Sequence, residues 1–280
     1  MSLSVTPQDR PDALDELFGV AKPIIGTIHL PPLPGSPRYD GQSMKEIRRR
    51  ALEDGQRYAE GGVDGLIVEN EGDTPFIKPE HLGPETAACM AVITADVVEA
   101  VGLPTGVLVL ANATVQSIAV AKAAGARFVR ANQWVNAYVA NEGFLEGTAG
   151  AALRYRASLR ATDVRVLADV HVKHGSHAIV ADRSVAELTR DTEAFDADVL
   201  IATGQRTGDP TLVRDVTAIS DVATRPVLVG SGLNAENARE LLQHASGAIV
   251  GSAMKEGGAW WNPVSVTSTR EIMTVVQDAR

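Results

Sequence analysis

The sequence predicts a single (β/α)₈ TIM barrel, an α/β fold in which each parallel strand is followed by a helix. Eight short apolar runs recur along the chain, with helix-length segments between them. The runs are nearly continuous, which is typical of parallel strands buried on both faces. The length of 280 residues also suits such a barrel. No G-x-G-x-x-G motif follows the first run, which disfavours an open dinucleotide-binding sheet.

Each predicted strand has apolar residues at its centre. In chain order they cover residues 23–30, 64–70, 105–110, 127–132, 164–170, 198–203, 226–231 and 247–252. The segments between them are predicted helices: residues 44–62 are rich in helix formers and end in Gly-Gly, a common helix stop. We expect residues 1–20 to be an N-terminal extension with a helix laid across the barrel base, and residues 21–280 to be one barrel domain.

Composition narrows the function classes. Hydrophobic residues make up 45% and charged residues 22% of the chain, as in an ordinary globular protein. The formal charge of −9 and the lack of a long basic block argue against nucleic acid as a partner. The first twenty residues do not resemble a signal peptide, and no apolar run is long enough to insert into a membrane. We therefore expect a cytoplasmic protein, and a homo-oligomer, because barrels commonly pair through rim loops.

Polar residues gather where the predicted strands end. In such barrels the chemistry takes place at the carboxyl ends of the strands, so these residues are the candidates for a site. In strand order the candidates are His29, Glu69, Asn70, Asp73, Arg130, Asn132, Asp169, His171, Lys173, His174, Thr203 and Arg206.

The segment "DVHVKHGSH" (169–177) is the densest group of ionisable residues at a strand end. If the strand continues through it, the period of two puts Asp169, His171 and Lys173 on one face. An acid, an imidazole and an ammonium so placed can tune one another for proton transfer. The alternative is a solvated loop with ion pairs and no chemistry.

Glu69, Asp73 and His29 are predicted to complete the catalytic set from neighbouring strand ends. The two acids could also cap the following turn. A divalent metal is a further hypothesis, because two imidazoles and two carboxylates suit Zn²⁺, Mn²⁺ or Fe²⁺. Its ligands would be His29, Glu69, Asp169 and His171, although no H-E-x-x-H motif is present.

The last two predicted strands lead into glycine-containing loops, "GSGLNAEN" and "GAIVGSAMK". Glycines let backbone amides approach a phosphate, a following helix N-terminus favours negative charge, and barrels usually bind phosphate at these two loops. The predicted phosphate site comprises Ser231, Gly232, Gly251 and Ser252. The remainder of a phosphorylated small-molecule substrate would contact Asn70, Arg130, Asn132, His174, Thr203 and Arg206.

Two further segments follow predicted strands. Residues 29–41 contain four prolines, so we expect a stiff, shaped loop that walls the site or packs on the barrel or on a neighbouring subunit. Trp134 and Tyr138 follow the fourth strand, where aromatic rings could stack on a sugar or base or form a subunit contact.

Several of these motifs together resemble the BtpA/SgcQ family. They are "IIGTIHLPPLPGSPRYDG", "DGLIVENEGDTPF", "RYRASLRATDVRVLADVHVKHGSH", "TGQRTGDP", "PVLVGSGLNAENA" and "GAIVGSAMKEGG". The resemblance runs from about residue 20 to the C-terminus and implies a barrel of the ribulose-phosphate-binding kind. Photosynthetic members are linked to photosystem I biogenesis, and bacterial relatives are similar to proteins encoded beside sugar-transport and sugar-phosphate genes. No single reaction comes with the resemblance.

Two functions remain open at this point. The first is an enzyme acting on a phosphorylated sugar or nucleoside-like compound, by isomerase, lyase or glycosidase-type acid–base chemistry. In it, Lys173 would act through its charge, because an acidic neighbour opposes the deprotonation that a Schiff base needs. The second is a non-catalytic assembly or regulatory factor that uses its proline-rich rim to hold a partner.

Overall fold

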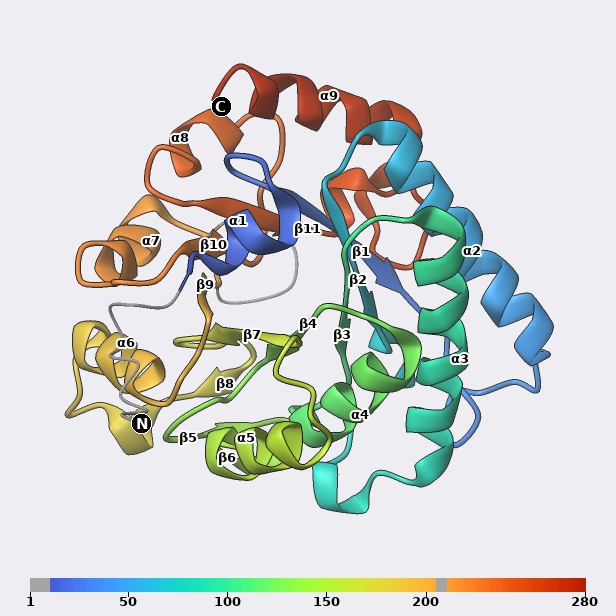
Figure 1. The fold of residues 1–280 in the computed structure, drawn as a ribbon, viewed down its shortest axis with the longest axis horizontal. Coiled ribbons are helices and arrows are strands. Elements are labelled where there is room, and N and C mark those ends of the chain that lie inside the picture. The colour runs from blue at the N-terminus through green and yellow to red at the C-terminus, as the bar shows by residue number, and fades with distance from the viewer. Residues whose placement is uncertain (1–10, 205–210) are drawn as a thin grey trace.

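A closed barrel of eight parallel strands forms the centre of the molecule, as seen in the computed structural model, which describes residues 11–204 and 211–280 (Figure 1). All eight predicted strands are confirmed. The strands, in their order around the barrel, are β1 (Ile24–His29), β2 (Gly65–Glu69), β3 (Thr105–Leu108), β4 (Phe128–Ala131), β7 (Arg165–Asp169), β9 (Val199–Ala202), β10 (Val227–Val229) and β11 (Gly247–Val250). The barrel closes where β11 pairs with β1.

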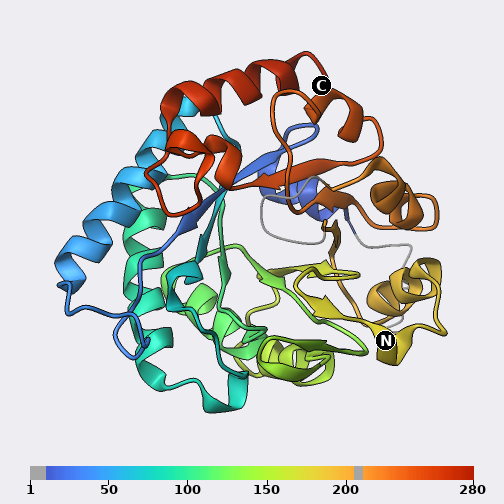
Figure 2. The same cartoon turned by 180° about the vertical axis from the view of Figure 1, so that it is seen from behind.

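Helices surround the barrel on its outer side (Figures 1 and 2). They are α2 (Met44–Gly61), α3 (Pro84–Val101), α4 (Thr114–Ala124), α5 (Ala149–Ser158), α6 (Val185–Ala194), α7 (Val213–Ser220), α8 (Ala238–Leu241) and α9 (Val266–Gln277). Local sequence fixes their ends: α2 is capped before Met44 by Ser43, whose hydroxyl accepts a hydrogen bond from the Glu46 amide, and after Gly61 by Gly62, which has a φ of 90°. Among the described residues, no helix combines the length and apolar character needed to cross a bilayer.

Helix α1 (Ala13–Phe18) lies over the amino ends of the strands (Figure 1). Its buried residues Ala13, Leu14 and Leu17 join the apolar cluster that fills the barrel interior. Within the described residues, α1 therefore closes the amino ends of the strands and leaves the carboxyl ends for a ligand to enter.

The cap of α1 gives a test of this packing. The carboxylate of Asp12 accepts a hydrogen bond from the Leu14 amide at 2.8 Å. We expect Asp12→Ala to lower the free energy of unfolding by about 1 kcal/mol, measured by urea denaturation. Asp12→Asn keeps an acceptor and should recover most of the loss; equal losses in both variants would contradict a capping role.

A second, smaller sheet has three antiparallel strands, which the sequence did not predict. The strands are β5 (Ala137–Ala140), β6 (Gly143–Glu146) and β8 (Gly175–Ser176), in the order β6-β5-β8. β5 and β6 form a hairpin in the connection between β4 and α5, and β8 comes from the segment after β7. This sheet joins the loops that follow two neighbouring barrel strands.

Candidate active site

A cavity of about 630 Å³ opens at the carboxyl ends of the barrel strands. This size is typical of a small-molecule site. Its lining combines apolar residues with ionisable and amide side chains from both halves of the barrel. The polar lining includes His29, Arg38, Glu69, Glu71, Arg130, Asn132, Lys173, His174, Ser231, Asn234 and Ser252.

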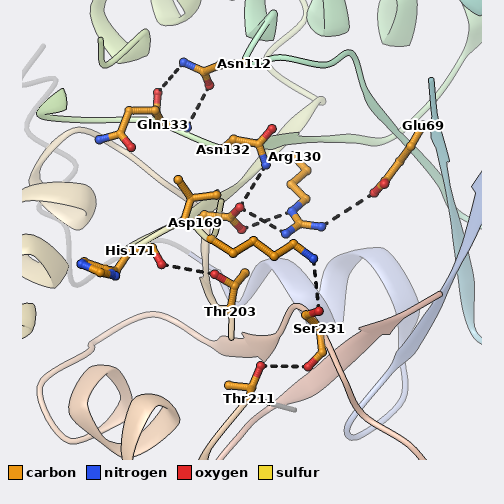
Figure 3. Close-up of polar contacts among 12 residues, drawn as sticks. Glu69, Asn112, Arg130, Asn132, Gln133, Asp169, His171, Thr203, Thr211 and Ser231 are labelled. Atoms are coloured by element: carbon orange, nitrogen blue, oxygen red, sulfur yellow. Dashed lines mark hydrogen bonds and ion pairs between the residues drawn. The ribbon is translucent and has the colours of Figure 1, made fainter. Parts of the chain in front are cut away.

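Arg130 lies at the centre of a buried ionic cluster on the cavity wall. Its Nε and Nη2 atoms donate to Asp169 Oδ1 and Oδ2 at 3.2 and 3.1 Å, and its Nη1 is 3.8 Å from Glu69 Oε1 (Figure 3). Asn132 Nδ2 donates to Asp169 Oδ2 at 3.1 Å. Both carboxylate oxygens of Asp169 are therefore used to hold Arg130 in one orientation.

Glu69 and His29 form a less constrained pair beside this cluster. Among the described residues, no hydrogen-bond partner reaches Glu69 Oε1, and burial raises the pKa of the carboxyl. His29 Nδ1 is 3.1 Å from the Trp260 carbonyl, so it carries the proton and Nε2 faces Glu69 Oε2 at 3.9 Å. Burial, and then the charge of Lys255, lower the pKa of His29 well below its usual value. The imidazole is thus neutral and lies beside an acid that burial favours in its protonated form.

Glu71 also lines the cavity, although it was not among the predicted site residues. Burial, followed by the charge of Glu69, raises its pKa to about 7. A carboxyl that titrates near neutrality can both accept and donate a proton under ordinary conditions. Glu71 stands two residues after Glu69, but β2 ends at Glu69 and Glu71 begins a short 3₁₀ helix, so the strand period does not predict its position.

Lys173 connects the ionic cluster to the opposite side of the cavity. Its Nζ donates to Ser231 Oγ at 3.1 Å. Burial, and then the charge of Arg130, lower its pKa. Glu69, Glu71, Arg130 and Lys173 line the cavity, and Asp169 lies buried behind Arg130. The five groups comprise three carboxyls and two cations, so the cluster has no net charge when one carboxyl is protonated.

The four residues predicted to hold phosphate all line this cavity. Gly232 has a φ of 71°, a conformation that favours glycine. A Cβ on Gly251 would lie 2.8 Å from His29 Cε1, so only glycine lets this loop and the His29 ring approach so closely. The amides of Gly232 and Leu233 donate to no protein acceptor in the described part of the chain.

The two loops of the predicted phosphate site differ in the helix that follows: after β11 a 3₁₀ helix of three residues begins at Ser252, whereas after β10 no helix begins next to Gly232. Helix α8 begins only at Ala238 and has four residues. After β10, loop amides and hydroxyls must therefore supply the donors. This loop is braced from behind, because Thr211 Oγ1 donates to the Ser231 carbonyl at 2.8 Å and Asn237 Nδ2 donates to the Gly232 carbonyl at 2.9 Å.

The predicted column of Asp169, His171 and Lys173 is not formed. β7 ends at Asp169, so the period of two does not continue to His171. The His171 ring stacks on His177 at 3.7 Å between centroids and does not line the cavity. Figure 3 shows this ring directed away from Asp169 and Arg130.

Three other predicted site residues, Asn70, Asp73 and Thr203, do not line the cavity and instead form hydrogen bonds that hold neighbouring segments in place. Asn70 Oδ1 accepts from the Leu110 amide and its Nδ2 donates to Asp73, both at 2.8 Å. Asp73 also accepts from the Leu33 amide at 2.7 Å, which ties down the proline-rich loop. Thr203 Oγ1 donates to the His171 carbonyl at 3.2 Å. His174 does line the cavity, and Arg206 lies outside the described residues.

The four candidate metal ligands do not form a metal site. Across residues 11–204 and 211–280, no three His, Cys, Asp or Glu side chains are arranged to hold an ion. The physical reasons are local: the His171 ring is turned away, and both oxygens of Asp169 accept hydrogen bonds from Arg130 and Asn132.

Of the two aromatic candidates, Tyr138 lines the cavity and Trp134 does not. Trp134 is fully buried in the core and its Nε1 donates to the Phe195 carbonyl at 2.8 Å, so the prediction of a rim position is wrong. Tyr138 lines the cavity from β5. The proline-rich loop packs on the barrel, as one of its two interpretations expected, and Arg38 from this loop lines the cavity.

Comparison with known sequences identifies relatives of almost the whole chain. The model of the BtpA family matches residues 20–278. An uncharacterized protein of Pyrococcus abyssi is 40% identical over 260 residues, which cover 93% of this chain and 98% of that protein. The photosystem I biogenesis protein BtpA of Synechocystis is 37% identical over 246 residues, or 88% of this chain and 84% of the relative.

Solved structures with the same fold are more distant in sequence. Thiamine phosphate pyrophosphorylase from Pyrococcus furiosus aligns with a TM-score of 0.56 at 17% identity, covering 92% of this chain and 96% of that one. (S)-3-O-geranylgeranylglyceryl phosphate synthase from Thermoplasma acidophilum, in complex with sn-glycerol-1-phosphate, aligns with a TM-score of 0.58 at 14% identity, covering 96% and 100%. At such low identities these similarities confirm the TIM-barrel fold alone.

Proposed function

The chain belongs to the BtpA family, and from that premise we propose that it is an enzyme acting on a phosphorylated sugar or nucleoside-like small molecule by acid–base chemistry. The observation that carries this proposal is one cavity lined both by the loops after β10 and β11 and by a buried set of ionisable groups. The Lys173–Ser231 hydrogen bond of 3.1 Å joins the two parts directly. A substrate of modest size can therefore contact both at once.

Each group in the cavity has a chemical role that follows from its surroundings. Glu71, with a pKa of about 7, transfers the proton. Arg130, held by Asp169, stabilises negative charge that develops on the substrate, and Lys173 lies between that charge and the phosphate. Glu69 and His29 form a second acid–base pair on the neighbouring strand ends.

This inventory suits proton transfer beside a carbonyl, as in isomerisation, epimerisation or aldol cleavage, and it suits cleavage of a glycosidic bond. Two structural relatives support the phosphate part of the proposal. Each is named for a phosphate compound, and one of them was solved with sn-glycerol-1-phosphate bound. Barrels of this class usually hold phosphate at the loops that correspond to β10 and β11 here.

A negative charge introduced on the cavity lining tests the phosphate site. Ser252→Asp places a carboxylate on the cavity lining, so we expect it to weaken binding of ribose 5-phosphate at least tenfold, as measured by calorimetry, because like charges repel at short range. Ser158→Asp is the matched control, since exposed Ser158 ends α5 and does not line the cavity. Equal affinities in the two variants would contradict the proposed phosphate site.

A second function has one observation in its favour, the name of the relative from Synechocystis. An assembly factor would keep the barrel and bind a partner through its rim, where the proline-rich loop lies. Such a role needs no phosphorylated ligand. If no phosphorylated compound binds to the unmodified protein, the enzyme proposal fails and the assembly role takes precedence.

A further inference from the structure

One side of the cavity is apolar, which a sugar phosphate alone does not explain. This apolar wall is part of a small hydrophobic cluster, separate from the two larger clusters of the barrel. Five members of the cluster line the cavity: Phe76, Ala111, Tyr138, Ala140 and Val172. They follow the strands β2, β3, β4 and β7.

The additional three-stranded sheet builds much of this apolar wall. In the β5–β6 hairpin, Tyr138 pairs with Leu145 on the buried face, and Val139 pairs with Phe144 on the exposed face. The Tyr138 ring stacks on His177 at 5.1 Å, and a Cβ on Gly175 would lie 2.4 Å from that ring. Packing on both sides fixes the ring. The barrel closes without this sheet, so the sheet is an addition to the cavity.

The apolar wall and the phosphate loops lie on opposite sides of the barrel mouth. In the strand order β1-β2-β3-β4-β7-β9-β10-β11, β4 is directly across from β11. The ionic cluster of Glu69, Arg130 and Asp169 comes from the ends of β2, β4 and β7, and the apolar wall comes from the segments that follow β2, β3, β4 and β7. A ligand that spans the cavity from the phosphate loops can therefore contact the ionic cluster at the strand ends and the apolar wall on the segments after them.

The chemistry of the apolar wall constrains what binds there. Hydroxyl groups of a sugar placed against it would lose their hydrogen bonds to water without gaining others, which is unfavourable. A planar apolar ring gains from the same contact. Thr74, Asn141 and Glu142 also line the cavity and provide hydrogen-bonding groups close in sequence to the wall residues. This mixture suits a heterocycle better than a hydrocarbon chain.

We propose that the ligand is a nucleoside 5′-monophosphate and that the apolar wall binds its heterocyclic base. The proposal rests on the enzymatic function proposed above and names its substrate class. The phosphate would occupy the loops after β10 and β11, the sugar would lie beside the ionic cluster, and the base would lie against Phe76 and Val172. The cavity volume of about 630 Å³ is larger than a sugar phosphate alone requires.

Calorimetry with two kinds of probe tests the apolar wall. Ribose 5-phosphate is titrated in parallel with the 5′-monophosphates of adenosine, guanosine, cytidine and uridine. We expect at least one nucleotide to bind about tenfold or more tightly than ribose 5-phosphate, because contact of a base with an aromatic side chain contributes ~1–3 kcal/mol. Phe76→Ala should remove most of that advantage and leave the affinity for ribose 5-phosphate within about twofold.

Phe144→Ala is the matched control, because Phe144 is 40% exposed on the outer face of the small sheet. It should change neither affinity. If Phe76→Ala does not fold, Ala140→Leu serves as the second variant, since it adds bulk on the cavity lining and should exclude the base while leaving ribose 5-phosphate bound.

The outcomes separate this inference from the proposed function. If ribose 5-phosphate binds as tightly as every nucleotide, the base site is wrong and the phosphate site stands. An equal loss for both kinds of ligand in Phe76→Ala or Ala140→Leu would also overturn the base site. If neither ribose 5-phosphate nor any nucleotide binds, both the proposed function and the base site fail.

Discussion

Replacing Glu71 with glutamine is expected to raise the free energy of unfolding by about 3 kcal/mol above pH 8 and by less than ~1 kcal/mol at pH 5, while reducing turnover about 100-fold or more. Few single substitutions in an active site stabilise a protein by this much. The reason here is that the folded protein holds Glu71 where its ionised form is disfavoured.

The sign follows from the direction of the pKa change. Folding raises the pKa of Glu71 from an ordinary value of 4.5 to about 7, mainly through burial and then through the charge of Glu69. Below pH 4.5 the carboxyl is protonated in both the folded and the unfolded chain, so the shift does not affect stability. Between these values the unfolded chain ionises first, and above pH 7 the folded chain carries the full cost, about 3 kcal/mol. Glutamine never ionises and avoids that cost.

Urea denaturation of the two proteins at several pH values between 5 and 9 measures the effect. The exposed residue Glu236 provides the control, because Glu236→Gln should change stability by less than ~0.5 kcal/mol at every pH. A difference between wild type and Glu71→Gln that does not grow with pH would show that Glu71 is not held in the environment described above.

The barrel was predictable because its signal is repeated along the chain. Each buried parallel strand is a short continuous apolar run, and eight such runs at regular spacing leave few alternative folds. The same regularity placed Glu69, Arg130, Asp169 and the glycine loops at one end of the barrel, because the carboxyl ends of all strands meet there. Residues at a strand end were therefore assigned to the correct side of the fold.

The errors arose where the chain leaves a strand. His171 was expected to follow the period of two, but β7 stops at Asp169 and the chain turns, so His171 stacks on His177 outside the cavity. After β2 the opposite error occurred, because a short 3₁₀ turn still directs Glu71 into the cavity. The sequence contains no sharp signal for either strand end.

Contacts between distant segments were also beyond the sequence. Lys255 in "GSAMKEGG" resembles a solvated loop lysine, yet its side chain is fully buried and pairs with Asp54 at 3.1 Å. Asp54 also accepts from the Val264 amide at 2.9 Å, so this contact fixes the loop that carries Ser252 and Trp260. Two residues 201 positions apart cannot be paired from a single sequence, because neither one indicates the other.

Replacing Arg130 with methionine is expected to lower the free energy of unfolding by about 3–5 kcal/mol. Arg130 and Asp169 are both buried and joined by two hydrogen bonds, so the substitution leaves the carboxylate of Asp169 buried with Asn132 as its remaining side-chain donor. Urea denaturation measures the loss. Arg48→Met is the control, since Arg48 pairs with Asp96 at the surface, where such pairs contribute less than ~1 kcal/mol.

The double variant Arg130→Met/Asp169→Leu separates stability from function. Apolar side chains of similar size remove the buried charge that the single variant leaves behind, so we expect the double variant to recover most of the lost stability. It should not recover turnover or ligand binding, because the charge beside Glu69 and Lys173 is still absent. A double variant as unstable as the single one would show that the cost lies in packing and not in the unpaired charge. If stability recovers and binding does not, apolar side chains can replace the Arg130–Asp169 pair in folding but not in function. The pair would then be retained because the cavity needs a fixed positive charge at this position.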